Sequence, residues 1–142
     1  MRSTLLLLAA LVLLPFSAWA QSAPEEIELW VPLLGHESAG MRGAAAIGLG
    51  QLGPKAAPAV PALIRALSDE SQKVRRLAAG SLGRIGLPAG SAVPELTRAL
   101  SAEDAAVRRA ATEALGLIGA PSGVAVPRLI EALSDRDRWV RR

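Results

Sequence analysis

Apolar and polar residues alternate along most of this chain with the period of an α-helix. Val60, Leu63, Ile64 and Leu67 stand at positions i, i+3, i+4 and i+7, which places them on one face of a helix. After a polar break, a second apolar stripe of the same kind is formed by Val74, Leu77, Ala78, Leu82 and Ile85. The pattern predicts two short amphipathic helices joined by a turn, and each needs a neighbour to cover its apolar face.

The two-helix pattern returns every 33 residues without a gap. Residues 60–86 match residues 93–119 at 16 of 27 positions, and 60–76 match 126–142 at 11 of 17. We therefore predict one repeat domain over 21–142, with units near 27–53, 60–86, 93–119 and a truncated 126–142. Because stacked units bury one another's apolar faces, the fold class that we expect is all-α, an α-solenoid that forms a right-handed superhelix.

The residues that flank each stripe suit the ends of helices. Pro61 fits the first turn of a helix, where a missing N–H costs nothing. Ser68 and Asp69 offer N-cap side chains to the second helix, and a capping-box spacing recurs in Ser101 with Asp104 and in Ser134 with Asp137. Glycine follows the second stripe, at a C-cap position suited to a left-handed residue, as Gly53, Gly86 and Gly119.

A glycine also recurs inside each second helix, as Gly50, Gly83 and Gly116. A glycine in a helix interior costs about 1 kcal/mol relative to alanine. The recurrence predicts close approach of neighbouring helices, and the alternative is drift in a sequence rich in glycine and alanine.

The first twenty residues have the layout of a secretory signal peptide. A start that carries Arg2 precedes an apolar run over 5–14, and Ala18 and Ala20 form a small-x-small cleavage pattern before Gln21. The apolar stretch over 5–20 is shorter than the roughly 20 residues that a spanning helix needs. We expect cleavage, export to the periplasm or the extracellular space, and no membrane span afterwards, with an uncleaved membrane anchor as the alternative.

Composition argues against most enzymes. The chain has no cysteine and one histidine, His36, so it carries no thiol nucleophile, disulfide or multi-histidine metal site. The net charge of +3 falls to +2 when Arg2 leaves with the signal, and charges of both signs are interspersed. A nucleic-acid binder concentrates its basic residues on one face, so nucleic acid is an unlikely partner. We expect no catalytic, cofactor or metal site.

The units resemble HEAT repeats, especially the short bacterial HEAT-like kind also found in phycobilisome lyase proteins. The resemblance rests on a proline in the first helix, an aspartate in the turn and a Val-Arg pair in the second helix. These positions are Pro61, Asp69 and Val74-Arg75 in the second unit; Pro94, Ala102 and Val107-Arg108 in the third; and Pro127, Asp135 and Val140-Arg141 in the fourth. It implies that Asp69, Arg75, Arg108, Asp135 and Arg141 form a structural ladder between units. Ala102 departs from the pattern, with Glu103 or Asp104 as candidate substitutes, and His36 replaces the first aspartate.

A second column of arginines, Arg76, Arg109 and Arg142, lies off the apolar stripe and is the candidate interaction surface, together with Trp139. Solenoids bind partners on extended concave surfaces, and arginines favour carboxylates because their guanidinium forms bidentate pairs. The alternative is an ordinary solvated face. Trp139 aligns with solvent positions of the other units and marks an interface, or packs beneath residues that are missing here.

The 33-residue frame predicts that a second helix of the fourth unit starts near the chain's end. The chain stops at Arg142, which is consistent with a fragment, a truncated gene, or completion by a partner. These observations together predict a non-enzymatic exported scaffold that binds another protein. The alternatives are a bilin-lyase-like protein, which the resemblance implies, and binding of a polyanion through Arg76, Arg109 and Arg142.

Overall fold

The computed structural model of the chain describes residues 23–119 and 122–141, and these residues form helices and turns without a β-strand. The elements in chain order are α3 (Ala23–Leu33), α4 (Ala39–Gln51), the 3-10 helix η1 (Gly53–Ala59), α5 (Val60–Ala66), α6 (Gln72–Ile85), the 3-10 helix η2 (Leu87–Ala92), α7 (Val93–Ala99), α8 (Ala105–Ile118) and α9 (Ser122–Ala132). The predicted all-α fold class is confirmed. No helix in the described ranges is long and apolar enough to cross a membrane.

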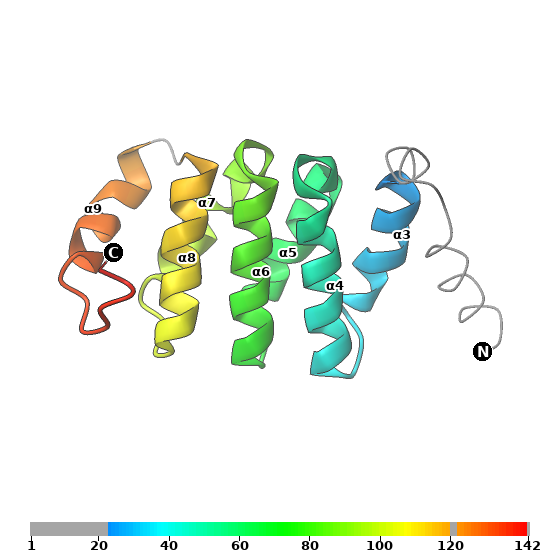
Figure 1. Cartoon of the computed structure of the whole chain (residues 1–142), viewed down its shortest axis with the longest axis horizontal. Coiled ribbons are helices and arrows are strands. Elements are labelled where there is room, and N and C mark those ends of the chain that lie inside the picture. The colour runs from blue at the N-terminus through cyan, green and yellow to red at the C-terminus, as the bar shows by residue number, and fades with distance from the viewer. Residues whose placement is uncertain (1–22, 120–121, 142) are drawn as a thin grey trace.

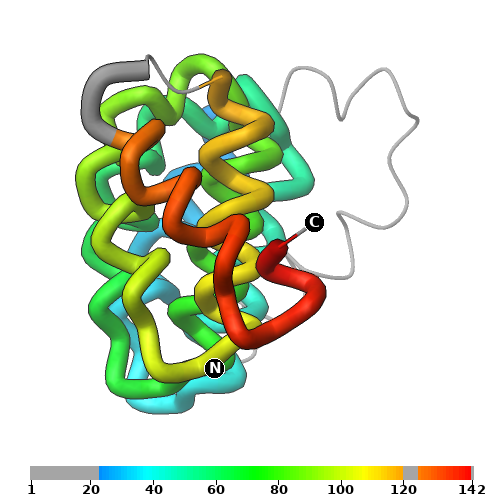
Figure 2. The backbone as a smooth tube through the Cα atoms, turned by 90° about the vertical axis from the view of Figure 1, so that its left-hand side faces the viewer, coloured from blue at the N-terminus to red at the C-terminus, as the bar shows by residue number. Residues whose placement is uncertain are grey.

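The helices stack in the two-layered row that the repeat predicts. The second helices α4, α6 and α8 lie side by side, and the first helices α5 and α7 lie behind them (Figure 1). Along the row, α3 lies at one end and α9 at the other, and α9 with the turn after it lies nearest the viewer in Figure 2. This arrangement is a helical solenoid, in which each unit contacts chiefly its neighbours.

The core repeats with the sequence. Leu49, Leu82 and Leu115, which stand 33 residues apart in the second helices, are each at most 1% exposed. Leu63 and Leu96 occupy equivalent positions in the first helices and are fully buried. Burying a leucine side chain contributes about 1.5–3 kcal/mol, so the same positions hold every internal interface together.

The glycines predicted to end the second helices meet that expectation in part: Gly119 is the left-handed C-cap of α8, Gly86 is the C-cap of α6 but lies outside the left-handed region, and Gly53 follows Leu52, the C-cap of α4. Gly53, Gly86 and Gly119 have φ angles of +58°, +74° and +66°, and they are the positive-φ glycines of the described residues. The proline-rich linkers that follow form the 3-10 helices η1 and η2. The first helices α5 and α7 begin at the residue before Pro61 and Pro94, so the predicted place of proline in the first turn is confirmed there.

The predicted N-caps are wrong. Helix α6 begins at Gln72 and its N-cap is Ser71, whose side chain makes no capping hydrogen bond, so Ser68 and Asp69 lie too far upstream. For α8 the N-cap is Asp104 itself, whose Oδ1 accepts the N–H groups of Ala106 at 2.6 Å and Val107 at 3.1 Å. The capping box read from Ser101 is therefore absent, because Asp104 occupies the cap position that the box assigns to serine.

The fourth unit retains one turn of its second helix. The amide of Arg141 donates to the carbonyl of Asp137 at 3.3 Å, as the amide of Arg75 donates to Ser71 at 3.0 Å in the first turn of α6. The first helix of this unit, α9, starts at Ser122, so Pro127 lies inside it and not in its first turn. The candidate residues Ala18, Ala20 and Arg142 lie outside the described residues.

Candidate functional site: a groove across the second helices

Two buried arginines join neighbouring units. The Nε and NH2 groups of Arg42 donate to the two carboxylate oxygens of Asp69 at 2.7 and 2.9 Å, and those of Arg108 donate to Asp135 at 2.8 and 3.0 Å. The arginines are 7% and 5% exposed. Each remaining NH1 group donates to two backbone carbonyls of its own turn, which for Arg108 belong to Ala102 and Glu103. These pairs fix the register of one unit on the next.

The ladder lacks its middle step. Arg75 donates to the carbonyls of Asp69 and Glu70 in its own turn, at 2.6 and 3.0 Å, and has no carboxylate partner in the described residues. The position that would supply one is Ala102. Glu103 and Asp104 do not replace it, since Asp104 caps α8. Arg141 likewise donates to the carbonyl of Asp135 at 2.6 Å.

The paired aspartates are stabilised in their charged form. The hydrogen bond from Arg42 lowers the pKa of Asp69, and burial opposes that shift. The hydrogen bond from Arg108 lowers the pKa of Asp135, with further help from the backbone N–H of Asp137. Both carboxylates therefore stay ionised at neutral pH, where they serve the structure and not acid–base chemistry.

His36 takes over the turn role of the aspartate that it replaces. Its Nδ1 accepts the backbone N–H of Ser38 at 3.0 Å, just as Oδ1 of Asp69 accepts the N–H of Ser71 at 2.8 Å. The imidazole is exposed in the turn between α3 and α4. This geometry gives the histidine a local structural role and places it away from the candidate groove.

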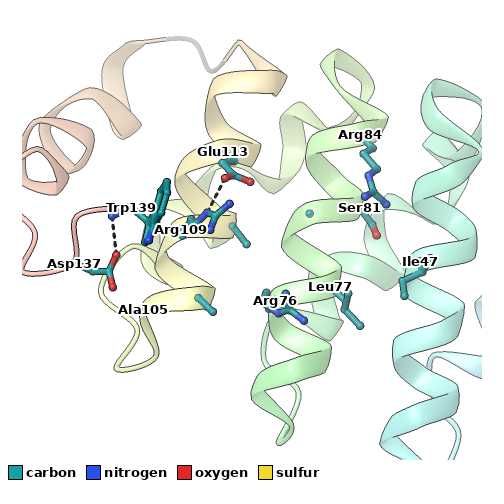
Figure 3. Close-up of a pocket in the computed structure, with 13 residues that line it drawn as sticks. Ile47, Arg76, Leu77, Ser81, Arg84, Ala105, Arg109, Glu113, Asp137 and Trp139 are labelled. Atoms are coloured by element: carbon teal, nitrogen blue, oxygen red, sulfur yellow. Dashed lines mark hydrogen bonds and ion pairs between the residues drawn. The ribbon is translucent and has the colours of Figure 1, made fainter. Parts of the chain in front are cut away.

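Arg76, Arg109 and Trp139 come together at one groove. Its volume is about 490 Å³, and side chains from α4, α6, α8 and the turn after α9 face it (Figure 3). The lining also includes Ile47, Leu77, Gly80, Arg84, Glu113 and Asp137. The structure thus places three of the four candidate interaction residues in one cavity, and the fourth, Arg142, is outside the described residues.

One wall of the groove is a network of paired groups. Nε of Arg109 donates to Oε1 of Glu113 at 2.9 Å, and its guanidinium lies 5.5 Å from the centre of the Trp139 ring. The guanidinium of Arg138 lies 4.6 Å from the same ring. Oδ1 of Asp137 accepts the backbone N–H of Trp139 at 2.8 Å. Both carboxylates on this wall are therefore engaged, and the ring is held although it is 44% exposed.

The other wall, on α6, carries free cations. Arg76 and Arg84 are exposed and line the groove, and neither forms an ion pair or hydrogen bond with any described residue. Gly80 lies midway between them. The floor is apolar where Leu77 and Ile47 line it. The hydroxyl of Ser81 is buried and donates to the carbonyl of Ala46 at 2.6 Å, so it joins α6 to α4 and is not an activated nucleophile.

The sequence analysis named Arg76, Arg109 and Trp139 but missed the other lining residues. Ile47, Gly80 and Glu113 occupy the same position of three consecutive second helices, each four residues after the candidate column, yet they share no chemistry. Arg84 aligns with Gln51 and Leu117 and so breaks the repeat. The signal that could have found Gly80 and Arg84 is the helical spacing i, i+4, i+8 that starts at Arg76.

Comparison with known proteins identifies the class. The sequence matches the family HEAT repeats over residues 27–90 and 60–142, so the chain belongs to this family, and the expected resemblance is confirmed. It is 36% identical to a chain in the complex of CpcE and CpcF of phycocyanin lyase from Nostoc sp. PCC7120, with a TM-score of 0.68. The match covers 75% of this chain and 41% of that chain.

An engineered protein of solved structure shares the fold at 23% identity, with a TM-score of 0.70 over 82% of this chain and 58% of that one. No curated protein matches. The chain thus spans about two fifths to three fifths of the solved chains that it resembles. In the described residues no group of three or more acidic, histidine or cysteine side chains could hold a metal ion.

Proposed function

We propose that this chain is a non-enzymatic HEAT-repeat scaffold that binds another protein through the groove across α4, α6 and α8. The observation that carries the proposal is the groove itself, in which exposed arginines and an exposed tryptophan surround an apolar floor. Arginine and tryptophan dominate the energetics of many protein interfaces. HEAT repeat proteins commonly mediate protein interactions, and the phycocyanin lyase relative was solved as a complex of two proteins.

A photo-crosslinking residue introduced at Ala106, which is exposed and lines the groove, tests this proposal in cells of the source organism. The matched control carries the same residue at Arg65, which is exposed on α5 in the other layer. We expect an adduct with one protein from position 106 and none from position 65. Equal labelling from both positions, or none from position 106, would overturn the proposal.

We also propose that the scaffold works outside the cytoplasm, in the periplasm or the extracellular space. The support is the charged start, the apolar run and the small residues Ala18 and Ala20 of the sequence. Mass spectrometry of the purified protein should find Gln21 at the N-terminus. A chain that retains residues 1–20 in the membrane fraction would replace export by an uncleaved anchor.

A second candidate is a lyase-like role on a chromophore or chromoprotein, which the 36% identity to the phycocyanin lyase complex favours. Purified protein mixed with a bilin would then change the absorbance spectrum of the chromophore. An unchanged spectrum at bilin concentrations well above that of the protein would remove this candidate and leave the scaffold function.

A further inference from the structure

The free cations of the groove have a defined spacing. Arg76 and Arg84 are eight residues apart on α6, and a helix rises 1.5 Å per residue, so they stand about 12 Å apart along its axis. Gly80 lies between them, and a Cβ added there would meet no heavy atom within 4 Å. The surface of α6 therefore presents two unpaired guanidinium groups on either side of an open gap.

An extended peptide matches this spacing. A strand rises about 3.3 Å per residue, and residues i, i+2 and i+4 face the same side, so carboxylates at i and i+4 lie about 13 Å apart. The side chain at i+2 then lies over Gly80, next to the apolar Leu77 and Ile47. Guanidinium groups bind carboxylates with paired N–H···O bonds, which gives such a segment both affinity and register.

The opposite wall argues against a polyanion. Glu113 and Asp137 line the groove and are negatively charged, and a continuous row of phosphates or sulfates would have to pass them. A polyanion also has no apolar group for Leu77 or the exposed ring of Trp139. Charge and apolar surface together favour a partner that carries acidic residues at intervals and an apolar residue between them.

We propose that the groove binds an extended segment of the partner protein in which two acidic residues at i and i+4 flank an apolar residue, with Arg76 and Arg84 receiving the two carboxylates. This proposal rests on the scaffold function proposed above and names the chemistry of its partner. Arg109 is fixed by Glu113 and Trp139 and forms the far edge of the site.

The test is fluorescence anisotropy of a labelled peptide Ser-Glu-Ser-Leu-Ser-Glu-Ser with the purified chain. The matched peptide replaces both glutamates by glutamines. We expect that only the acidic peptide binds saturably. The Arg76→Ala/Arg84→Ala variant should bind this peptide with an affinity lower by roughly tenfold or more. The control variant Arg65→Ala/Arg98→Ala removes the same charge from the first helices and should change affinity less than about twofold.

A second variant, Gly80→Leu, keeps both arginines and fills the gap, and it should weaken binding as much as the double arginine variant. The inference is overturned if both peptides bind alike, if neither arginine loss nor Gly80→Leu weakens binding, or if no saturable binding occurs up to about 1 mM peptide. Stronger binding of a heparin fragment than of the peptide would assign the groove to polyanions. A groove-specific crosslink from Ala106 without peptide binding would retain the scaffold and reject this partner chemistry.

Discussion

Arg108 and Asp135 bind each other through two parallel N–H···O bonds although 27 residues separate them. The same bond pair joins Arg42 to Asp69, and it is absent between these two steps because Ala102 stands where an aspartate would meet Arg75. Among the described residues, adjacent units are thus tied by a buried charge pair at two interfaces, whereas no such pair joins them at the middle interface, where apolar packing holds them.

Restoring the missing carboxylate should stabilise the protein. In the variant Ala102→Asp, Arg75 gains the acceptor that Arg42 and Arg108 already have. Hydrogen bonds to charged groups contribute about 1.5–3 kcal/mol, and partial exposure of Arg75 reduces this, so we expect a gain of about 1–2 kcal/mol in the free energy of unfolding. Urea titration measures it. Ala102→Asn is the control and should gain less, since it offers a neutral acceptor; an equal gain would contradict the ion-pair explanation.

The paired aspartates should make the fold sensitive to acid. Their pKa values lie below the unfolded value of about 3.9, so the unfolded state binds more protons as pH falls. Their contribution is complete above about pH 5 and is lost as pH falls through the folded pKa values. Unfolding titrations between pH 7 and pH 2 should show this loss.

The variant Asp69→Asn/Asp135→Asn is the control for the acid effect. It should be less stable than the parent at pH 7, because Arg42 and Arg108 lose their charged partners. Its stability should change less between pH 4 and pH 2. A variant that lost as much stability on acidification as the parent would show that other groups cause the acid sensitivity.

Much of the fold could be predicted from the sequence because every unit packs against its neighbour in the same way, so the buried positions repeat. Leu49, Leu82 and Leu115 repeat because each fills the same place between units. The N-cap prediction at Asp69 was wrong because a carboxylate in a turn can accept hydrogen bonds either from a helix N-terminus or from a side chain of another unit. Here Arg42 of the neighbouring unit is the donor, and local sequence patterns do not show it. Of the groove, the sequence indicated the repeated Arg76 and Arg109 and the single Trp139. Arg84 and Gly80 belong to one unit alone, so only the spatial arrangement assigns them.

Two of the three recurring glycines, Gly83 and Gly116, should respond to alanine with opposite changes in stability. A Cβ at Gly83 would lie 2.9 Å from Cα of Ala114 in α8, whose backbone cannot yield cheaply, whereas a Cβ at Gly116 would meet no atom of the described residues within 4 Å. The predicted close approach therefore holds for Gly83 and not for Gly116. We expect Gly83→Ala to destabilise by about 1–3 kcal/mol and Gly116→Ala to stabilise by about 1 kcal/mol. Thermal unfolding of the two variants measures both, and equal signs would contradict the packing explanation.

Gly50 and Ser81 should be energetically coupled across α4 and α6. Ser81 donates its buried hydroxyl to Ala46, and that oxygen lies 2.6 Å from the place of a Cβ at Gly50. Gly50→Ala should cost about 1–3 kcal/mol, and Ser81→Ala about 1 kcal/mol.

In the double variant the alanine at position 50 no longer meets the hydroxyl, although Cβ and Cα of residue 81 remain 2.9 and 3.0 Å away. The double variant should therefore lose less stability than the two single variants together, by at least about 0.5 kcal/mol. Gly50→Ala combined with Thr97→Val is the control. Thr97 donates to Val93 within α7, so its substitution should add independently. Additivity in both cycles would show that the close approach at Gly50 is relieved without Ser81.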